Sequence, residues 1–406
     1  MTVQELRKQF PALGREVYGR PLIYLDNAAT TQRPQSVIDV QSDSALLHNG
    51  NTHRAVHALA GEATRAYEGA REAVRAFIGA ESADEIVFTS GTTASINLVA
   101  SSFGDIFIGS GDEIIIAESE HHSDIIPWQL LCQRKGAKIV VLPVDESGHL
   151  EIDKLPSIIT KHTKLVCVAH VSNVLGLVNP IKEIVSLAHS HGVPVLVDGA
   201  QAVAHLAVDV KDMDCDFYAF SGHKMYAATG TGVLYAKKEI LEQMPPFMGG
   251  GEMIETVSWE GSTYAPIPFK FEAGTPNINS VPTFVPAIDL VKSINGECAS
   301  ELSAIKNFVY EALASDERIV PRGTTRNIDE KLPLFSFSVK GVHHEDLALV
   351  LDKMGIALRS GHMCAQPLMA RYGVTGMLRA SFAPYNTLKE AQIFIESLDK
   401  AINMLR

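Results

Sequence analysis

The chain has 406 residues, of which 46% are hydrophobic and 20% are charged, and its formal net charge at pH 7 is -12. This composition is typical of a globular protein with a substantial core and excludes a disordered chain. The acidic balance also argues against nonspecific binding to nucleic acid. At this length we expect a large domain and a smaller one, because single cores usually stop growing at shorter lengths.

The cysteines favour free thiols over a structural role. Five are present, widely spaced and without a CxxC pair, which is typical of a reducing compartment and not of a disulfide framework or a zinc site. The first residues lack an apolar signal core, and no apolar run is long enough to span a bilayer. We therefore expect a cytoplasmic protein without a membrane segment.

Hydrophobic periodicity predicts three helices and one strand in the first part of the chain. The helices are expected at residues 4–10, 35–48 and 61–78, and the strand at residues 22–25. A polar loop, residues 49–54, lies between the second and third helices and carries His53. We interpret this loop as a candidate edge of a site.

A phosphate cradle is predicted after a strand at residues 85–89. That strand leads into Ser90-Gly91-Thr92-Thr93 and then into a helix that begins near Ala94. The glycine lets the backbone come close, the hydroxyls donate hydrogen bonds, and the helix N-terminus offers free N–H groups. The alternative is an ordinary helix cap made by Ser and Thr; the lysine found further along the chain favours the cradle.

Polar residues follow the next strands at their expected carboxyl ends. The strand at residues 113–116 leads to His121, which could stack on a flat cofactor or shuttle protons. A histidine in a surface loop is the alternative. Strands at residues 137–142 and 165–170 come next, and Asn173 follows the second of them.

The strongest site signal is a pair of charged residues on successive strands. The strand at residues 193–198 ends in Asp198, and the strand at residues 217–220 is followed by Ser221-Gly222-His223-Lys224. Such a lysine can form a Schiff base once it loses its proton, and a carboxylate at a strand end lies where α/β folds bind ligands. Pyridoxal phosphate enzymes need both groups, although a lone lysine after a strand is usually a solvated surface residue.

Strands and helices alternate from residue 85 to a last strand at residues 233–235. This order predicts an α/β protein with a mainly parallel, doubly wound sheet that helices cover on both faces. One long helix is expected over residues 281–316, and mixed strands and helices from there to residue 406.

Two residues in the last part of the chain are further candidates. Cys364 lies in a loop bracketed by glycine and proline, so we expect an exposed thiol, and the neighbouring Arg359 and His362 favour the reactive thiolate. Buried thiols are expected for the cysteines in apolar segments. Arg379 follows in a strand, where its guanidinium could grip an amino acid carboxylate in a two-point contact.

These segments together resemble the type II cysteine desulfurases, the SufS-type branch of the pyridoxal phosphate-dependent fold type I enzymes in the class V aminotransferase family. The resemblance covers essentially the whole chain. The motifs that carry it are Leu25-Asp26-Asn27-Ala28-Ala29-Thr30, Gly91-Thr92-Thr93, Glu120-His121-His122-Ser123, His170-Val171-Ser172-Asn173-Val174-Leu175-Gly176, Asp198-Gly199-Ala200-Gln201, Ser221-Gly222-His223-Lys224 and Arg359-Ser360-Gly361-His362-Met363-Cys364. Ala227-Ala228 departs from the family, which often has Gly-Pro there, so the local turn stays open.

The resemblance implies an organisation as well as a fold. A large cofactor-binding domain with a seven-stranded sheet would occupy residues 21–285. A smaller α+β domain, residues 286–406, would carry the cysteine loop, and an N-terminal segment, residues 1–20, would pack with it. The protein would form a homodimer.

The resemblance also implies a role for each polar residue at the cofactor. Lys224 would hold the cofactor and transfer protons, Asp198 would pair with the ring nitrogen, and His121 would stack on the ring and assist catalysis. Gln201 would contact the phenolic oxygen. The phosphate ligands would be Thr92, Thr93, Ser221, His223 and the partner subunit's Thr275.

At the substrate, Arg379 and Asn173 would hold the carboxylate, with His53 and Arg359 nearby in less defined roles. The implied reaction converts L-cysteine to L-alanine and leaves a persulfide on Cys364. A SufE-like or SufU-like protein would collect this sulfur for iron–sulfur cluster assembly. L-selenocysteine would be a second substrate, and no metal is expected.

Two other hypotheses stay open from the sequence. A kynureninase-like hydrolase or an aminotransferase of the same fold would share the aspartate and the lysine but would not need a loop thiol. A non-catalytic scaffold could keep the fold and bind a partner, although the complete set of polar residues argues against it.

Overall fold

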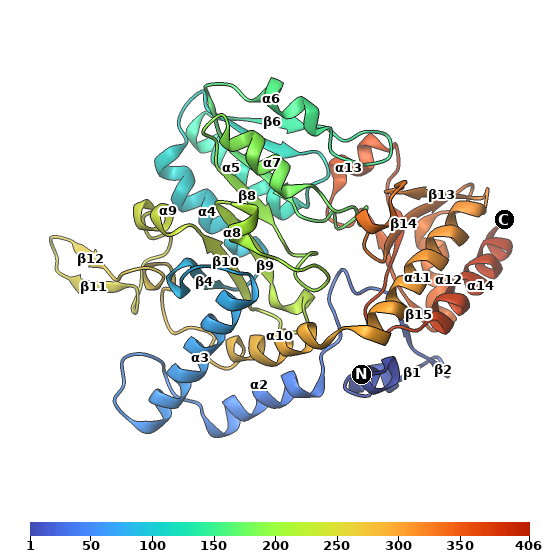
Figure 1. Cartoon of the computed structure of the whole chain (residues 1–406), viewed down its shortest axis with the longest axis horizontal. Helices are drawn as coiled ribbons and strands as arrows, with labels where there is room; N and C mark the ends of the chain where they lie inside the picture. The colour runs from blue at the N-terminus through green and yellow to red at the C-terminus, as the bar shows by residue number, and fades with distance from the viewer.

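The computed structural model describes all 406 residues and arranges them around two main sheets (Figure 1). A seven-stranded sheet with its flanking helices fills the left part of the view, and a four-stranded sheet covered by helices lies on the right. None of the helices combines the length and the apolar character that crossing a membrane requires.

The large sheet is mainly parallel and has the strand order β4-β10-β9-β8-β7-β5-β6. Only β10 runs antiparallel to its neighbours, β4 and β9. The bounds of the strands are β4 Ile86–Thr89, β5 Glu113–Ala117, β6 Lys138–Leu142, β7 Thr163–Ala169, β8 Val195–Asp198, β9 Phe217–Ser221 and β10 Gly232–Ala236. The predicted seven-stranded α/β architecture is confirmed.

The strands of this sheet are apolar on both sides because helices cover both faces. In β8, for example, Val195 and Val197 belong to one core and Leu196 to the other, since successive side chains point to opposite faces. One face is covered by α3 Ala58–Phe77, α7 Ile181–His189 and α10 Phe284–Ser293. The other is covered by α4 Thr92–Phe107, α5 Ile126–Lys135 and α9 Lys238–Gln243.

The small sheet is antiparallel, in the order β13-β14-β17-β16, and has a core of its own. Its elements are β13 Ile319–Arg322, β14 Leu334–Val339, β16 Arg359–Gly361, β17 Met377–Ser381, α11 Gly296–Ser315, α12 His344–Lys353 and α14 Leu388–Leu405. A separate parallel pair joins β3 Ile23–Tyr24 to β15 Ile356–Ala357. The segment after β3 is therefore held beside the small sheet.

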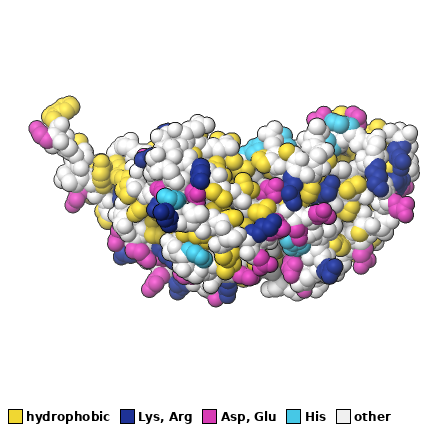
Figure 2. Space-filling model, turned by 90° about the horizontal axis from the view of Figure 1, so that it is seen from above, with side chains coloured by type: hydrophobic (Ala, Val, Ile, Leu, Met, Phe, Trp, Pro, Cys, Tyr) yellow, Lys and Arg dark blue, Asp and Glu magenta, His cyan; other side chains and the backbone are white.

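The remaining elements are short or lie apart from the two sheets. They are α1 Val3–Arg7, β1 Glu16–Val17, β2 Arg20–Pro21, α2 Gln35–Leu47, α6 Leu155–Ile158, α8 Val210–Met213, β11 Ile254–Val257, β12 Ser262–Tyr264 and α13 Gln366–Arg371. β11 and β12 form an antiparallel hairpin that projects from the large-sheet side, with hydrophobic side chains at its tip (Figure 1 and Figure 2). This hairpin was not predicted from the sequence.

The single long helix predicted over residues 281–316 is wrong. The chain leaves the helical conformation between α10 and α11, where Asn295 is extended with φ -150° and ψ -176°. Gly296 then adopts a left-handed φ of +52°, which favours glycine. Periodicity did not reveal the break because both segments carry apolar residues at helical spacing. The predicted domain limits at residues 20 and 285 stay predictions.

Candidate active site

The carboxyl ends of β7, β8 and β9 open into a cavity of about 550 Å³. Open α/β sheets bind ligands in such a crevice. Most of the predicted site residues line it, namely Thr92, Thr93, His121, Asn173, Asp198, Gln201, Ser221, His223, Lys224, Arg359, Cys364 and Arg379. Gln201 is fixed by a hydrogen bond of 2.7 Å from its Nε2 to the carbonyl of Ala28.

Lys224 and Asp198 come from neighbouring strands, as predicted. Asp198 ends β8, and Lys224 ends the 3-10 turn that follows β9. Burial lowers the pKa of Lys224, and the Asp198 carboxylate opposes that shift. Burial raises the pKa of Asp198, whereas Lys224 and the N–H of Ala200, 2.8 Å from Oδ1, lower it. The cavity wall therefore offers an amine that loses its proton readily beside a buried acid.

The start of α4 and the end of β9 form the predicted cradle. The N–H of Thr92 donates to Ser221 Oγ at 2.8 Å, and the two hydroxyl oxygens also lie 2.8 Å apart. A Cβ on Gly232 would collide with the backbone of Gly91, so the close approach of β10 requires glycine. With the free N–H groups of the first turn of α4, this geometry suits a phosphate group.

His121 borders the cavity as a neutral imidazole. Its Nδ1 accepts a hydrogen bond of 3.0 Å from the N–H of Ser123. Burial lowers the pKa of His121 to about 3, and the charge of Lys224 adds to the shift. Burial likewise lowers the pKa of His223 to about 4. A flat, uncharged ring fixed at this position suits stacking on an aromatic cofactor.

Asp26 holds the two arginines of the predicted substrate site. Its Oδ1 lies 3.2 Å from Arg379 Nη2, and its Oδ2 lies 3.0 Å from Arg359 Nη2. Arg379 also donates from Nη1 to the carbonyl of Asn173 at 2.9 Å. Its Nε is buried without a partner, so one N–H remains available for a carboxylate. This role of Asp26 was missed from the sequence, where its only signal is an acidic residue directly after a strand.

The loop that carries Cys364 faces the cavity from the small sheet. Cys364 is exposed, whereas the other four cysteines are buried. Met363 and Cys364 have left-handed φ angles of 51° and 56°, which side chains rarely adopt. The N–H of His122 donates to the Cys364 carbonyl at 2.7 Å, and the N–H of Cys364 donates to His362 Nδ1 at 3.1 Å. Asn173 Nδ2 donates to the Met363 carbonyl at 2.7 Å, so the loop is held on both sides of the thiol.

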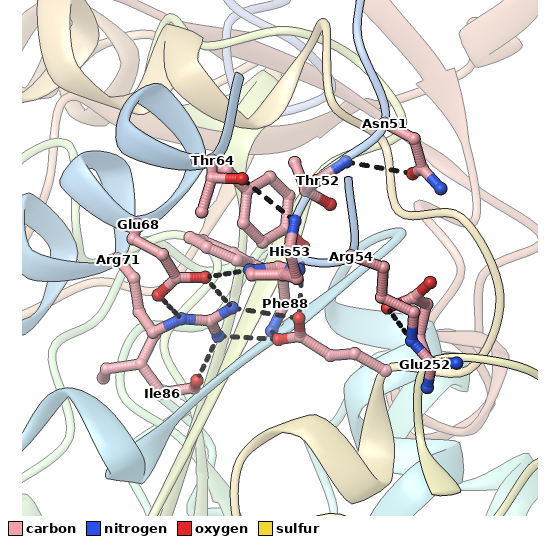
Figure 3. Close-up of polar contacts among 12 residues, drawn as sticks. Asn51, Thr52, His53, Arg54, Thr64, Glu68, Arg71, Ile86, Phe88 and Glu252 are labelled. Atoms are coloured by element: carbon pink, nitrogen blue, oxygen red, sulfur yellow. Dashed lines mark hydrogen bonds and ion pairs between the residues drawn. The ribbon is translucent and has the colours of Figure 1, made fainter. Parts of the chain in front are cut away.

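Two predicted residues, His53 and Thr275, do not line this cavity within one chain. His53 borders a second cavity of about 230 Å³ together with the two neighbours of Thr275 in the sequence. Its Nε2 lies 2.9 Å from Glu68 Oε1, and Figure 3 shows it beside the buried Arg71, which also binds Glu68. The predicted roles of His53 and Thr275 stay predictions.

Two buried carboxylates, one before and one after His121 in the sequence, were also missed by the sequence analysis. Glu120 Oε1 accepts the N–H of Ala169 at 2.8 Å, and Asp124 Oδ1 accepts the indole N–H of Trp128 at 2.7 Å. The second oxygen of each carboxylate has no partner. Burial raises the pKa of Glu120 well above its usual range, and Asp124 adds to the rise. No sequence pattern points to these two residues, because acidic residues are rarely buried.

Known proteins resemble this chain over its whole length. The family described as Aminotransferase class-V matches residues 23–394. A probable cysteine desulfurase of Vibrio cholerae is 43% identical over 406 residues, which covers 100% of both chains. A cysteine desulfurase of Cronobacter sakazakii is 46% identical over 405 residues, which covers 100% of this chain and 99% of that protein.

Solved structures share the fold over the same length. The cysteine desulfurase CsdA from Escherichia coli has a TM-score of 0.91 and 39% identity, with 100% of both chains covered. A cysteine desulfurase from Thermococcus onnurineus NA1 has a TM-score of 0.93 and 37% identity, with 100% of this chain and 99% of that chain covered. The shared fold therefore includes both sheets and the elements that form the cavity.

Proposed function

We propose, from the premise that this chain belongs to the class V aminotransferase family and is a pyridoxal phosphate-dependent cysteine desulfurase, that Cys364 takes the sulfur of L-cysteine as a persulfide. L-alanine is the other product. The observation that supports this role is the position of the thiol: Cys364 is exposed and lines the cavity that also contains Lys224 and Asp198.

The residues of the cavity fit pyridoxal phosphate. They offer an amine for its aldehyde, a buried carboxylate for its ring nitrogen, a flat imidazole, an amide and a group of phosphate donors, namely Lys224, Asp198, His121, Gln201, Thr92, Thr93, Ser221 and His223. When bound, this group supplies an electron sink that stabilises negative charge on the substrate Cα.

The carboxylate of L-cysteine is assigned to Arg379 and Asn173. The Nε–H of Arg379 is buried and lacks a partner, while Asp26 braces the other side of the guanidinium. Contacts of the carboxylate with this N–H and with the amide of Asn173 would fix the orientation of the substrate. Lys224 then removes the proton from Cα, which its lowered pKa favours.

Cys364 then attacks the sulfur of the substrate as a thiolate. A bond forms between the two sulfur atoms as the Cβ–S bond of the substrate breaks, and the electron pair of the broken bond stays with Cβ. Protonation turns Cβ into the methyl group of L-alanine. Overall, L-cysteine and the Cys364 thiol give L-alanine and a Cys364 persulfide, so no external oxidant is needed.

The proposal extends to assembly and partners. A homodimer would let Thr275 reach the phosphate in the other subunit; exposed hydrophobic side chains such as Val56, Val257 and Trp259 support such an interface. A SufE-like or SufU-like protein would collect the sulfur for iron–sulfur cluster assembly, and L-selenocysteine would be a second substrate. The five free thiols support a cytoplasmic location.

Cys364→Ala tests the central step. The variant should keep the absorbance of the bound cofactor, because Lys224 and Asp198 are unchanged. Its rate of alanine formation from cysteine should fall by about two orders of magnitude or more. Mass spectrometry of the wild type after one turnover should find one added sulfur atom on the peptide that contains Cys364. The buried Cys298→Ala is the matched control. Undiminished alanine formation by Cys364→Ala would remove this thiol from the mechanism.

A further inference from the structure

Three side chains, two of which line the cavity, form a cluster that the proposed reaction does not use as a unit. One ring nitrogen of His122, one ring nitrogen of His362 and the Sγ of Cys364 all lie within 4.8 Å of one another. Imidazole nitrogen and thiolate sulfur are the usual protein ligands of zinc. We propose that this cluster, His122, His362 and Cys364, binds a divalent ion of the zinc class and that the bound ion blocks the enzyme.

The ligands come from two parts of the fold that face each other. His122 lies in the turn after β5, and the other two lie in the loop between β16 and α13. The rings of His122 and His362 are 5.5 Å apart between centroids and inclined by 35°. Ligand atoms around a tetrahedral zinc ion are roughly 3.5 Å apart, so the cluster must contract by about 1 Å. The exposed Cys364 side chain can supply much of this movement by rotation.

Binding of an ion would disturb hydrogen bonds of the same loop. His122 Nε2 accepts the N–H of Gln366 at 3.1 Å, and His362 Nδ1 accepts the N–H of Cys364 at 3.1 Å. An ion must therefore displace one of these N–H groups or turn a ring so that another nitrogen faces the sulfur. Since Cys364 is held in a left-handed conformation, we expect ion binding and the loop conformation to be coupled.

The cluster leaves room for a fourth ligand. Three protein ligands and one open position are the arrangement of zinc sites that exchange a ligand with solvent. The exposed carboxylate of Glu345, on the first turn of α12, lines the same cavity and adds negative charge there. Either this carboxylate or water can complete a tetrahedral ion.

The ion would act on the sulfur atom itself. On binding, the Cys364 thiol releases its proton to solvent and a metal–sulfur bond forms, without any oxidation or reduction. The sulfur lone pair is then no longer free to attack the substrate, so desulfuration stops until the ion leaves. The inhibition rests on the proposed function of Cys364, whereas the binding of the ion does not.

A titration of the cofactor-loaded enzyme with Cd²⁺, without cysteine, tests the site. We expect one ion per chain with the ultraviolet band of a cadmium–thiolate bond, and no such band with Cys364→Ser. His362→Asn and His122→Gln keep an acceptor for the two N–H groups but remove a ring nitrogen, and each should weaken binding about tenfold or more. His343→Asn changes an exposed histidine outside the cluster and should bind Cd²⁺ as the wild type does. Absence of the band from the wild type, or wild-type affinity for Cd²⁺ in both ring variants, would overturn the site.

A second measurement separates this site from the proposed function. Zn²⁺ should inhibit alanine formation by the wild type, and a chelator should restore it. If Cd²⁺ binds through Cys364 and the same concentration of Cd²⁺ leaves alanine formation unchanged, the thiol has no part in the reaction and the inhibition is disproved. If Cys364→Ala abolishes alanine formation but no ion binds, the function stands and the metal site is disproved.

Discussion

The wall that carries Lys224 and the loop that carries Cys364 face one cavity but are built in opposite ways. Lys224 follows a strand buried on both faces, and burial lowers its pKa against the opposing effect of the Asp198 carboxylate. Cys364 is exposed and is positioned by hydrogen bonds to the backbone in a left-handed conformation. Lys224 and Asp198, the two charged groups suited to holding a cofactor, therefore lie in a buried part of the molecule. The group suited to passing on an atom lies where another molecule can reach it.

Replacing Lys224 should have the largest effect on alanine formation. Lys224→Ala removes the lysine of the cavity, so alanine formation should fall by about four orders of magnitude or more. Borohydride should no longer attach the cofactor covalently, which peptide mass spectrometry can check. Lys161→Ala, at an exposed position, should behave as the wild type. A covalent label on another lysine would show that a residue other than Lys224 binds the cofactor.

Asp26 braces two arginines of the small sheet, and its loss should have the next largest effect. Asp26→Asn weakens its contact to the buried Arg379, worth about 1.5–3 kcal/mol, and its contact to the half-exposed Arg359, worth less than about 1 kcal/mol. We expect kcat/KM for cysteine to fall about tenfold to a hundredfold, mainly through a higher KM. Steady-state kinetics check this, with the exposed Asp329→Asn as control. An unchanged KM would show that Arg379 needs no brace.

Thr275 allows the comparison to be extended to a second chain. If Thr275 donates one hydrogen bond to the phosphate in the other subunit, Thr275→Ala should weaken cofactor binding about fivefold, the effect of about 1 kcal/mol. A heterodimer of one Lys224→Ala chain and one Thr275→Ala chain should then contain one complete site. Cofactor absorbance at limiting pyridoxal phosphate measures both. Equal cofactor affinity in Thr275→Ala and wild type would place this residue outside the site.

The smallest predicted effect concerns the two buried carboxyl groups, Glu120 and Asp124, and the free energy of unfolding. Glu120 has a raised pKa, so the folded chain keeps a proton that the unfolded chain releases above the ordinary value of 4.5. The free energy of unfolding should therefore fall as pH rises above that value. Asp124→Asn removes one carboxylate and offers Glu120 an N–H group, so the variant should be about 1 kcal/mol more stable at pH 8.

At pH 5 the same Asp124→Asn substitution should give a smaller gain in stability, because burial raises the pKa of both carboxyl groups and keeping them protonated costs less at that pH. Chemical denaturation at pH 5 and pH 8 measures the difference, and Asp153→Asn, at an exposed position, serves as the control. A gain of the same size at both pH values would show that the raised pKa values of these two carboxyl groups do not cause the change.

The positions of Asp198 and Lys224 could be predicted from the sequence because they depend on nearby residues. Asp198 and Lys224 each follow an apolar strand, and the alternation of strands and helices places both strand ends at one edge of the sheet. The exposure of Cys364 followed from the glycine and proline around it. These signals need only neighbouring residues.

What the sequence did not reveal depends on contacts between distant segments. Asp26 binds Arg379 across 353 positions of the chain, and His122 accepts a hydrogen bond from Gln366 across 244 positions. Neither pairing leaves a periodic pattern. The break at Asn295 was missed for a different reason, since a change of backbone angle at one or two residues does not interrupt apolar spacing.

The unpartnered Nε–H of Arg379 has a consequence for the progress of the reaction. In the proposed role this group would grip only the carboxylate, which L-alanine retains unchanged after the sulfur has gone. The product therefore fits the same grip as the reactant, and the two differ only at Cβ. Accumulating L-alanine should compete with L-cysteine for this site. The enzyme should therefore slow down as L-alanine accumulates, unless another reaction consumes it.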